Sequence, residues 1–298
     1  MVQKQSLAAG VIASVVLPFA PNGEMDADQL RAEVELLEES GVDGLCVGGL
    51  LSGVAGARPD ELHSLTATIR RASRKTLFAM VFPDVTLEAL EMTRAVADGG
   101  AEAIFVAQPH YLCQPGEAGL LEMFAELKKS VSCPLLLADC FPEAKVDLKT
   151  TKTLISKRLV DGVLQAADVH YLVDLLCTHP RVPVYSGIED LHYVAYMLGA
   201  HGAISDLAAV FPADFSDVYR SFRAGMHEEA RHHHERLVRL WHVLSLTAER
   251  EARLRSALIA QGRKVGPAPS PYGELQSEVA REIANTLQSE GLAVTVSP

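Results

Sequence analysis

The sequence predicts an α/β protein, a (β/α)8 barrel followed by a helical C-terminal extension. Two observations lead to this prediction. Short apolar, β-rich runs alternate with longer amphipathic segments over roughly the first 210 residues, the pattern of repeated βα units. After Pro212 the strand pattern stops and helical periodicity takes over. We therefore expect two parts, a barrel over residues 1–212 and a helical extension over residues 213–298.

The expected strands are short runs of buried character, each bounded by polar, glycine or proline residues. Their number and their separation by helical segments predict a closed barrel with all strands parallel. In chain order the strands are expected at residues 10–16, 44–47, 76–81, 103–107, 134–138, 161–164, 182–186 and 202–204.

The expected helices are amphipathic and long enough to cross from one parallel strand to the next. Within the barrel they include residues 27–39, 87–98, 119–131 and 148–156. The extension has helical patterning over residues 213–223, 227–246, 249–261 and 276–289, with the proline-rich run 266–271 separating the last two.

The composition excludes several classes of function. Hydrophobic residues make up 48% of the chain, which is enough for a sizeable core. Lys and Arg number 27 against 38 Asp and Glu, a net charge of −11 that repels phosphate backbones and anionic membrane surfaces. We therefore expect no nucleic-acid or membrane partner, and small molecules or other proteins instead.

The cysteines and the apolar runs predict a cytoplasmic protein. Five cysteines are odd in number and form no CxxC pair, which favours neither a disulfide framework nor a zinc ribbon. The first ten residues lack the apolar run of a signal peptide, and no later apolar stretch reaches the ~20 residues of a membrane span. No cofactor is predicted.

Short glycine- and proline-containing motifs follow one another in order along nearly the whole chain. They include residues 10–13 with 17–19, 41–44 with 47–49, Asp60-Glu61, 109–111 with 114–115, and 199–205. Their order and spacing resemble those of the dihydrodipicolinate synthase and N-acetylneuraminate lyase family. Members of that family are pyruvate-handling class I aldolases, so the resemblance implies a barrel fold with its site at the carboxyl ends of the strands.

Most residues that carry the family's chemistry are replaced. The resemblance places Leu164 where the family has its Schiff-base lysine, and leucine cannot form an imine. Ala138 stands at the position of a proton-relaying tyrosine, and Glu143 at that of an arginine that binds the substrate carboxylate. The paired threonines become Leu50 and Leu51. The tyrosine that reaches across a dimer interface is retained as Tyr111.

These replacements predict a non-catalytic homologue, a pseudoenzyme. We expect it to bind a small ligand or to act as a structural or regulatory subunit, paired with itself as a dimer or tetramer or with an active family member. The ligand pocket at the old site is expected to be apolar. Its predicted lining is Gly49, Leu50, Leu51, Tyr111, Ala138, Leu164, Gly187 and Ile204.

The alternative is an enzyme that uses the same barrel in a different way, as a lyase or aldolase on a small oxo acid. Lys145 follows the fifth predicted strand and is a substitute for the missing amine, although an exposed loop lysine is the simpler interpretation. Carboxylates at strand ends are a second substitute, because hard metal ions prefer oxygen ligands. These are Asp139, Glu189, Asp190 and Asp206, whose simpler role is helix capping or exposure to solvent.

Overall fold

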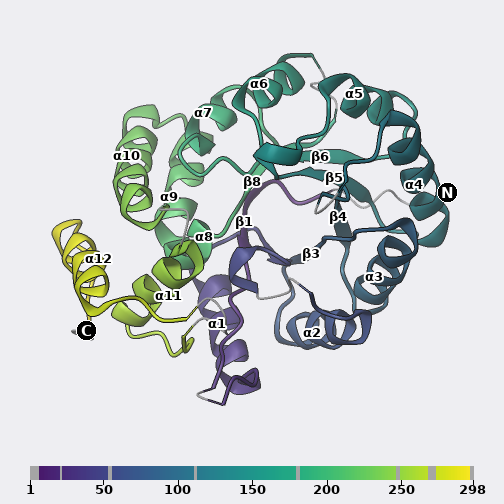
Figure 1. Ribbon diagram of the computed structural model, residues 1–298. Coiled ribbons are helices and arrows are strands. Elements are labelled where there is room, and N and C mark those ends of the chain that lie inside the picture. The colour runs from purple at the N-terminus through teal and green to yellow at the C-terminus, as the bar shows by residue number, and fades with distance from the viewer. Residues whose placement is uncertain are drawn as a thin grey trace.

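The described residues of the chain form a closed barrel of eight parallel strands. The computed structural model describes residues 7–20, 22–52, 56–110, 113–178, 182–245, 249–267 and 273–295. Each strand pairs with its neighbours in chain order, and β8 closes onto β1 (Figure 1). The strands are β1 (Gly10–Ser14), β2 (Gly44–Val47), β3 (Thr76–Val81), β4 (Ala103–Ala107), β5 (Leu135–Asp139), β6 (Gly162–Gln165), β7 (Val184–Ser186) and β8 (Gly202–Ser205).

The predicted (β/α)8 fold is confirmed, and most of the predicted bounds lie within two residues of the observed ones. The strands read as nearly continuous apolar runs because helices cover the outside of the barrel and side chains fill its inside. The barrel helices are α1 (Ala27–Glu39), α2 (Pro59–Ala72), α3 (Thr86–Asp98), α4 (Glu117–Ser130), α5 (Leu148–Ser156), α6 (Val169–Thr178), α7 (His192–Met197) and α8 (Leu207–Val210). Two 3-10 turns, η1 (Leu50–Ser52) and η2 (Pro142–Ala144), follow β2 and β5.

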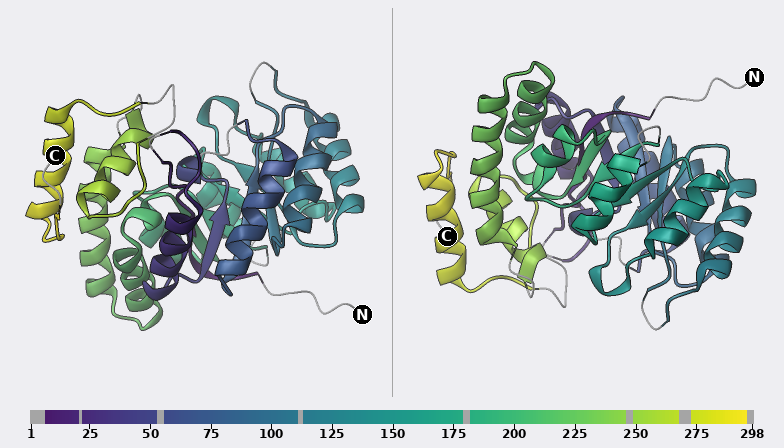
Figure 2. Two further views of the ribbon diagram at one scale, coloured as in Figure 1. Left: turned by 90° about the horizontal axis from the view of Figure 1, so that it is seen from below. Right: turned by 90° about the horizontal axis from the view of Figure 1, so that it is seen from above.

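The remaining helices stand together on one side of the barrel. They are α9 (Pro212–Arg223), α10 (His227–Leu244), α11 (Arg250–Ala260) and α12 (Ser277–Ser289). Figure 2 shows α12 as the outermost layer, beyond α10 and α11. A division of the chain at residue 212 stays a prediction. None of the described helices combines the length and the apolar character needed to cross a bilayer.

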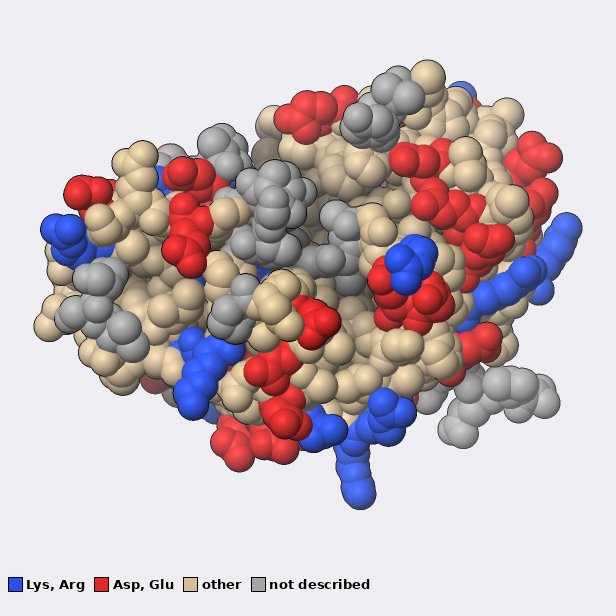
Figure 3. Space-filling view, turned by 60° about the horizontal axis from the view of Figure 1, so that its bottom comes forward, with Lys and Arg blue, Asp and Glu red and all other residues tan. Residues whose placement is uncertain are grey.

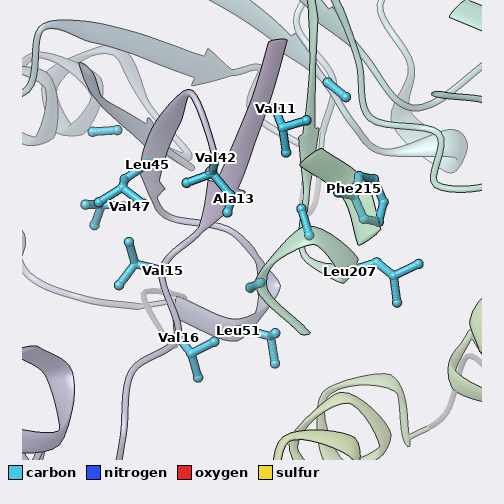
Figure 4. Close-up of a cluster of buried hydrophobic side chains, with 14 of the residues drawn as sticks. Val11, Ala13, Val15, Val16, Val42, Leu45, Val47, Leu51, Leu207 and Phe215 are labelled. Carbon is cyan, nitrogen blue, oxygen red and sulfur yellow. The ribbon is translucent and has the colours of Figure 1, made fainter. Parts of the chain in front are cut away.

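Two apolar layers hold the barrel together. The outer layer lies between strands and helices, and Figure 4 shows part of it, where Val11 and Ala13 of β1 lie near Leu207 and Phe215. The inner layer fills the barrel, and its aromatic centre is Phe78, Phe105 and Tyr185, with ring centroids 5.6–5.8 Å apart. The interior is therefore a packed core rather than a channel.

The N-terminal segment covers the amino ends of the strands. The Tyr185 hydroxyl donates a hydrogen bond of 2.7 Å to the carbonyl of Ala8, and the His201 ring lies 3.0 Å from the carbonyl of Leu7. Leu7 and Ala8 also pack against the inner core. This end of the barrel is closed, so the candidate site lies at the other end, where the strands end.

Candidate functional site

The candidate site is the carboxyl end of the barrel, and its floor is made by inward-pointing residues of the strands. Leu164 of β6 lies between Ala138 of β5 and Tyr185 of β7 in the sheet register, and its side chain belongs to the inner core. It is only 3% exposed. The position that the resemblance assigns to a lysine therefore holds a buried aliphatic side chain.

The predicted pocket residues are partly brought together. Ala138, Leu164 and Ile204 share the inner core, and a methyl group added at Gly187 would lie 3.1 Å from the Leu164 side chain. Leu51 instead packs in the outer core. Tyr111 and the side chain of Leu50 lie outside the described residues.

Gly49 lies where three strand ends approach one another closely. A Cβ atom at this position would lie 2.1 Å from the Ser14 Oγ atom and 2.4 Å from the Asp206 Oδ1 atom, distances that no side chain tolerates. Only glycine fits there, because the ends of β1, β2 and β8 leave no room for a Cβ atom. The same contact brings the Ser14 hydroxyl and the Asp206 carboxylate together beside the floor.

Asp139 belongs to a buried hydrogen-bond network behind the floor. Its carboxylate accepts hydrogen bonds from the Gln165 side chain at 2.7 Å and from the backbone N–H of Val146 at 3.0 Å. The Gln165 amide oxygen accepts in turn from the N–H groups of Ala167 and Asp168. Burial raises the pKa of Asp139, and the hydrogen bond from Gln165 opposes the shift. The network orders the loops after β5 and β6.

Lys145 follows η2, in the loop after β5. Its Nζ atom is 2.5 Å from the Asp168 carboxylate and 4.9 Å from the centre of the Tyr171 ring. The ion pair with Asp168 raises the pKa of Lys145 above that of an ordinary lysine. A raised pKa keeps the amine protonated, which lowers its nucleophilicity. Glu143, in η2, is exposed, and its carbonyl accepts a hydrogen bond from Gln114.

The carboxylates considered as metal ligands have separate contacts. Glu189 accepts hydrogen bonds from Ser205 Oγ and from the N–H groups of Asp206 and Leu207, and it lies 3.1 Å from the His192 ring. Asp190 is exposed. Across the described ranges, no three His, Cys, Asp or Glu side chains are grouped so that they could hold a metal ion.

A group of aromatic side chains lies just beyond the ends of β3 and β5, and it was not singled out from the sequence. Phe82 follows β3 and Phe141 follows β5, and both pack against the inner core. Their ring centroids are 5.9 Å apart, and the His110 ring is stacked on Phe141 at 3.8 Å. The period-two alternation of a strand would have predicted an inward direction for Phe82, because Phe82 is two residues beyond the inward-pointing Met80.

The chain matches the family model described as the Dihydrodipicolinate synthetase family over residues 7–290. It belongs to this family. A relative named 4-hydroxy-tetrahydrodipicolinate synthase, from Synechococcus sp. (strain JA-2-3B'a(2-13)), is 27% identical, with 95% of this chain and 94% of the relative covered. A solved dihydrodipicolinate synthase superposes with a TM-score of 0.87 at 25% identity, covering 96% of this chain and all of the other.

These relatives correct the functional prediction. The interpretation as a non-catalytic homologue is wrong, because relatives at 24–27% identity over nearly the full chain are named as synthases and nothing in the comparisons indicates a pseudoenzyme. The replacements at the strand ends led to that interpretation. The family is one of lyases and aldolases.

Members of the family are typically oligomers, although one solved structure is described as a monomeric dihydrodipicolinate synthase variant. That structure superposes with a TM-score of 0.88 at 20% identity and covers 96% of this chain and 98% of the other. At this identity the likeness shows the shared fold alone.

Proposed function

We propose that this chain is a lyase or aldolase that acts on a small oxo acid at the carboxyl end of its barrel. The observation that carries the proposal is the family match over residues 7–290, which spans every barrel strand. Relatives that match nearly the whole chain are named for a reaction of this family. The reaction class is therefore a carbon–carbon or carbon–oxygen bond cleavage or formation.

We further propose that the site differs from that of a Schiff-base aldolase. None of the described barrel strands contains a lysine, and β6 reads Gly-Val-Leu-Gln. If the reaction passes through an imine, another amine must attack the carbonyl carbon, with loss of water. Lys145 is the candidate, because it lies in a loop on the carboxyl face of the barrel.

Lys145 must lose a proton before it can attack a ketone, and the ion pair with Asp168 opposes that loss. Imine formation at Lys145 should therefore increase as the pH rises. It should also increase at neutral pH in Asp168→Asn, because removal of the carboxylate returns the pKa of Lys145 towards its ordinary value.

Borohydride trapping tests the proposal. Protein incubated with pyruvate and sodium borohydride is analysed by intact mass and peptide mapping. We expect an adduct in the wild-type protein and in Lys149→Ala, a matched exposed lysine on α5, and none in Lys145→Ala. No adduct, while a family member with a strand lysine is trapped in parallel, would rule out the imine route. The proposed lyase would then be refuted if pyruvate release from aldol substrates were also absent with and without added divalent metal.

We also propose that the chain assembles with itself or with another family member. Apolar side chains are exposed on two neighbouring barrel helices, with Val173 of α6 at 38%, Val194 of α7 at 45% and Met197 of α7 at 58%. Exposed apolar side chains of this kind favour a protein contact. A cytoplasmic location is part of the same proposal.

A further inference from the structure

The side chain of Lys145 lies against the start of α6. Its Nζ atom is 2.5 Å from Asp168 Oδ2 and 4.9 Å from the centre of the Tyr171 ring. The other oxygen of Asp168 accepts hydrogen bonds from the N–H groups of His170, at 2.8 Å, and of Tyr171, at 3.2 Å. Asp168 therefore binds the first turn of α6 with one oxygen and the ammonium group with the other.

Gln165 fixes the backbone that leads into Asp168. It is the last residue of β6, and its side chain is fully buried. Its amide oxygen accepts hydrogen bonds from the N–H groups of Ala167, at 2.8 Å, and of Asp168, at 3.0 Å. Its amide nitrogen donates to the Asp139 carboxylate at 2.7 Å. Gln165 thus determines the course of the loop and, with it, the position of the Asp168 carboxylate.

Asp139 fixes the loop on the other side of the ion pair. Its Oδ1 atom accepts a hydrogen bond of 3.0 Å from the N–H of Val146, the residue directly after Lys145. Its carbonyl accepts from the N–H groups of Ala166 and Ala167 at 2.8 and 3.1 Å. Buried hydrogen bonds of this kind make a structure rigid. The loop of Lys145 and the loop of Asp168 are therefore attached to one buried pair, Asp139 and Gln165.

Charge attraction alone explains the contact between Lys145 and Asp168 poorly. The Lys145 side chain is 42% exposed, and water weakens an exposed ion pair. Holding a long lysine side chain in one geometry also costs conformational entropy. The contact needs a carboxylate that is already in place, and the hydrogen bonds of Gln165 supply that preorganisation.

We propose that Gln165 is a positioning residue for Lys145, which acts through the backbone and the carboxylate of Asp168. With the carboxylate in place, the protonated form of Lys145 is favoured. Release of the loop would move the carboxylate away and make the free amine more abundant. The inference deepens the proposed function and rests on it only for the role of Lys145 as a nucleophile, since the ion pair exists whether or not an imine forms.

Trace acetylation of the whole protein with acetic anhydride at pH 8 tests the inference without any substrate. The reagent reacts with the free amine, and peptide mass spectrometry gives the acetylation rate of Lys145 relative to that of Lys149, an exposed lysine on α5. We expect this ratio to rise about threefold or more in Gln165→Leu, and at least as much in Asp168→Asn. The rise should shrink at higher pH, where both amines lose their protons, whereas simple unmasking of the side chain would not depend on pH.

Gln114→Leu is the matched control. Gln114 is also a glutamine at the carboxyl face, and its side chain donates to the Glu143 carbonyl, in the same loop as Lys145. It has no printed contact with the loop of Asp168, so the ratio in Gln114→Leu should equal that of wild type. Circular dichroism shows whether each variant is folded.

An exchange of the buried pair gives a second test, which is decisive if Gln165→Leu fails to fold. Asp139→Asn alone places two amide donors face to face, so the ratio should rise. The double variant Asp139→Asn with Gln165→Glu exchanges donor and acceptor and can keep every hydrogen bond of the pair. Its ratio should return towards that of wild type.

An unchanged ratio in a folded Gln165→Leu would overturn the inference, and so would equal ratios in Asp139→Asn and the double variant. The two proposals fail separately. Absence of imine trapping and of lyase activity, with the acetylation ratios as expected, refutes only the lyase. An active lyase whose Lys145 is equally reactive in wild type and Gln165→Leu refutes only the positioning role.

Discussion

Leu164 occupies the position that the resemblance assigns to the Schiff-base lysine. Its neighbours across the sheet are Ala138 and Tyr185, and its surroundings are apolar. An amine at this position would be desolvated, which lowers a lysine pKa and makes the neutral, nucleophilic form more abundant. The same burial costs stability.

We therefore expect Leu164→Lys to gain imine formation and to lose stability. The loss should be roughly 2–5 kcal/mol, because a buried amine must be desolvated or must lose its proton. Urea unfolding measures the loss, and borohydride trapping with pyruvate, mapped to residue 164, measures the gain. Leu164→Met, which keeps the volume, should change stability by less than about 1.5 kcal/mol and form no adduct. An unchanged midpoint in Leu164→Lys would show that the position is not buried as described.

Asp139 is important for stability rather than for catalysis. Asp139→Ala removes the acceptor of two buried donors, Gln165 Nε2 and Val146 N–H. Each unpaired buried donor costs about 1–3 kcal/mol, so we expect a loss of roughly 2–5 kcal/mol in urea unfolding. Asp190→Ala on the exposed surface is the control and should unfold like wild type.

The loss caused by Asp139→Ala should depend on pH. Burial raises the pKa of this carboxyl in the folded protein above its value in the unfolded chain. For an acid shifted in this direction, stability is lost as the pH rises from the unfolded pKa through the folded pKa. The wild-type protein loses this stability as the pH rises and Asp139→Ala does not. The difference in free energy of unfolding between the two proteins should therefore be smaller at pH 7 than at pH 4. A larger difference at pH 7 would contradict the direction of the shift.

At the scale of elements, helix α11 is fastened to the loops at the carboxyl ends of β1 and β2. Arg255, 1% exposed, pairs with Glu251 and donates hydrogen bonds to the carbonyls of Leu17 and Leu51, and its guanidinium lies 5.0 Å from the Phe19 ring centre. The C-terminal helices thus help to order the turn that contains Leu51. This buried arginine connects residues more than 200 positions apart in the chain.

Arg255→Met should destabilise the protein by about 3–5 kcal/mol, because it leaves Glu251 buried without its partner. The measurement is thermal or urea unfolding. Arg231→Met, which breaks exposed pairs with Glu228 and Glu235 on α10, is the matched control and should have little effect. If the double variant Arg255→Met with Glu251→Leu recovered none of the loss, the buried pair would not be its cause.

The elements themselves were largely predictable from the sequence. Strands such as 76–81 and 103–107 were predicted at their observed bounds, because parallel strands that are buried on both faces leave continuous apolar runs. The errors lie at strand ends, where the apolar pattern does not specify the last hydrogen bond. β5 and β6 each continue one residue further, to Asp139 and Gln165, and these two polar residues face each other.

The site was less predictable, since its contacts join residues from different βα units. The ion pair of Lys145 with Asp168 spans 23 positions, and nothing in the local pattern indicates it. The contact of Gly49 with Ser14 and Asp206 depends on how three strand ends meet. Positions could be assigned from the resemblance, whereas the direction and the partner of each side chain required the structure.

On the scale of the whole molecule, acidic side chains predominate over basic ones on the face in Figure 3, as the net charge of −11 requires. Like charges repel, so self-association needs apolar contacts that outweigh the repulsion. The exposed side chains of α6 and α7 are the described residues that offer such contacts on neighbouring barrel helices.

We expect sedimentation velocity at physiological salt to show a species heavier than the 32.1 kDa monomer. Met197→Glu combined with Val194→Glu should shift the distribution towards the monomer, because two buried carboxylates would face each other across the contact. Leu87→Glu, on the exposed face of α3, is the control and should sediment like wild type. A wild-type protein that sediments as a monomer at all concentrations tested would refute self-assembly through this surface.

The backbone of Leu7 and Ala8 receives two side-chain contacts, from Tyr185 and His201, at the end of the barrel opposite to the site. These two residues close the amino end of the barrel and shield its aromatic core from solvent. A chain trimmed to start at Val11 would keep all of the candidate site, but water would reach Phe78 and Phe105 from the amino end of the barrel. Amide exchange of β3 and β4 should then speed up, because Leu7 and Ala8 limit how well the inner core is shielded from water.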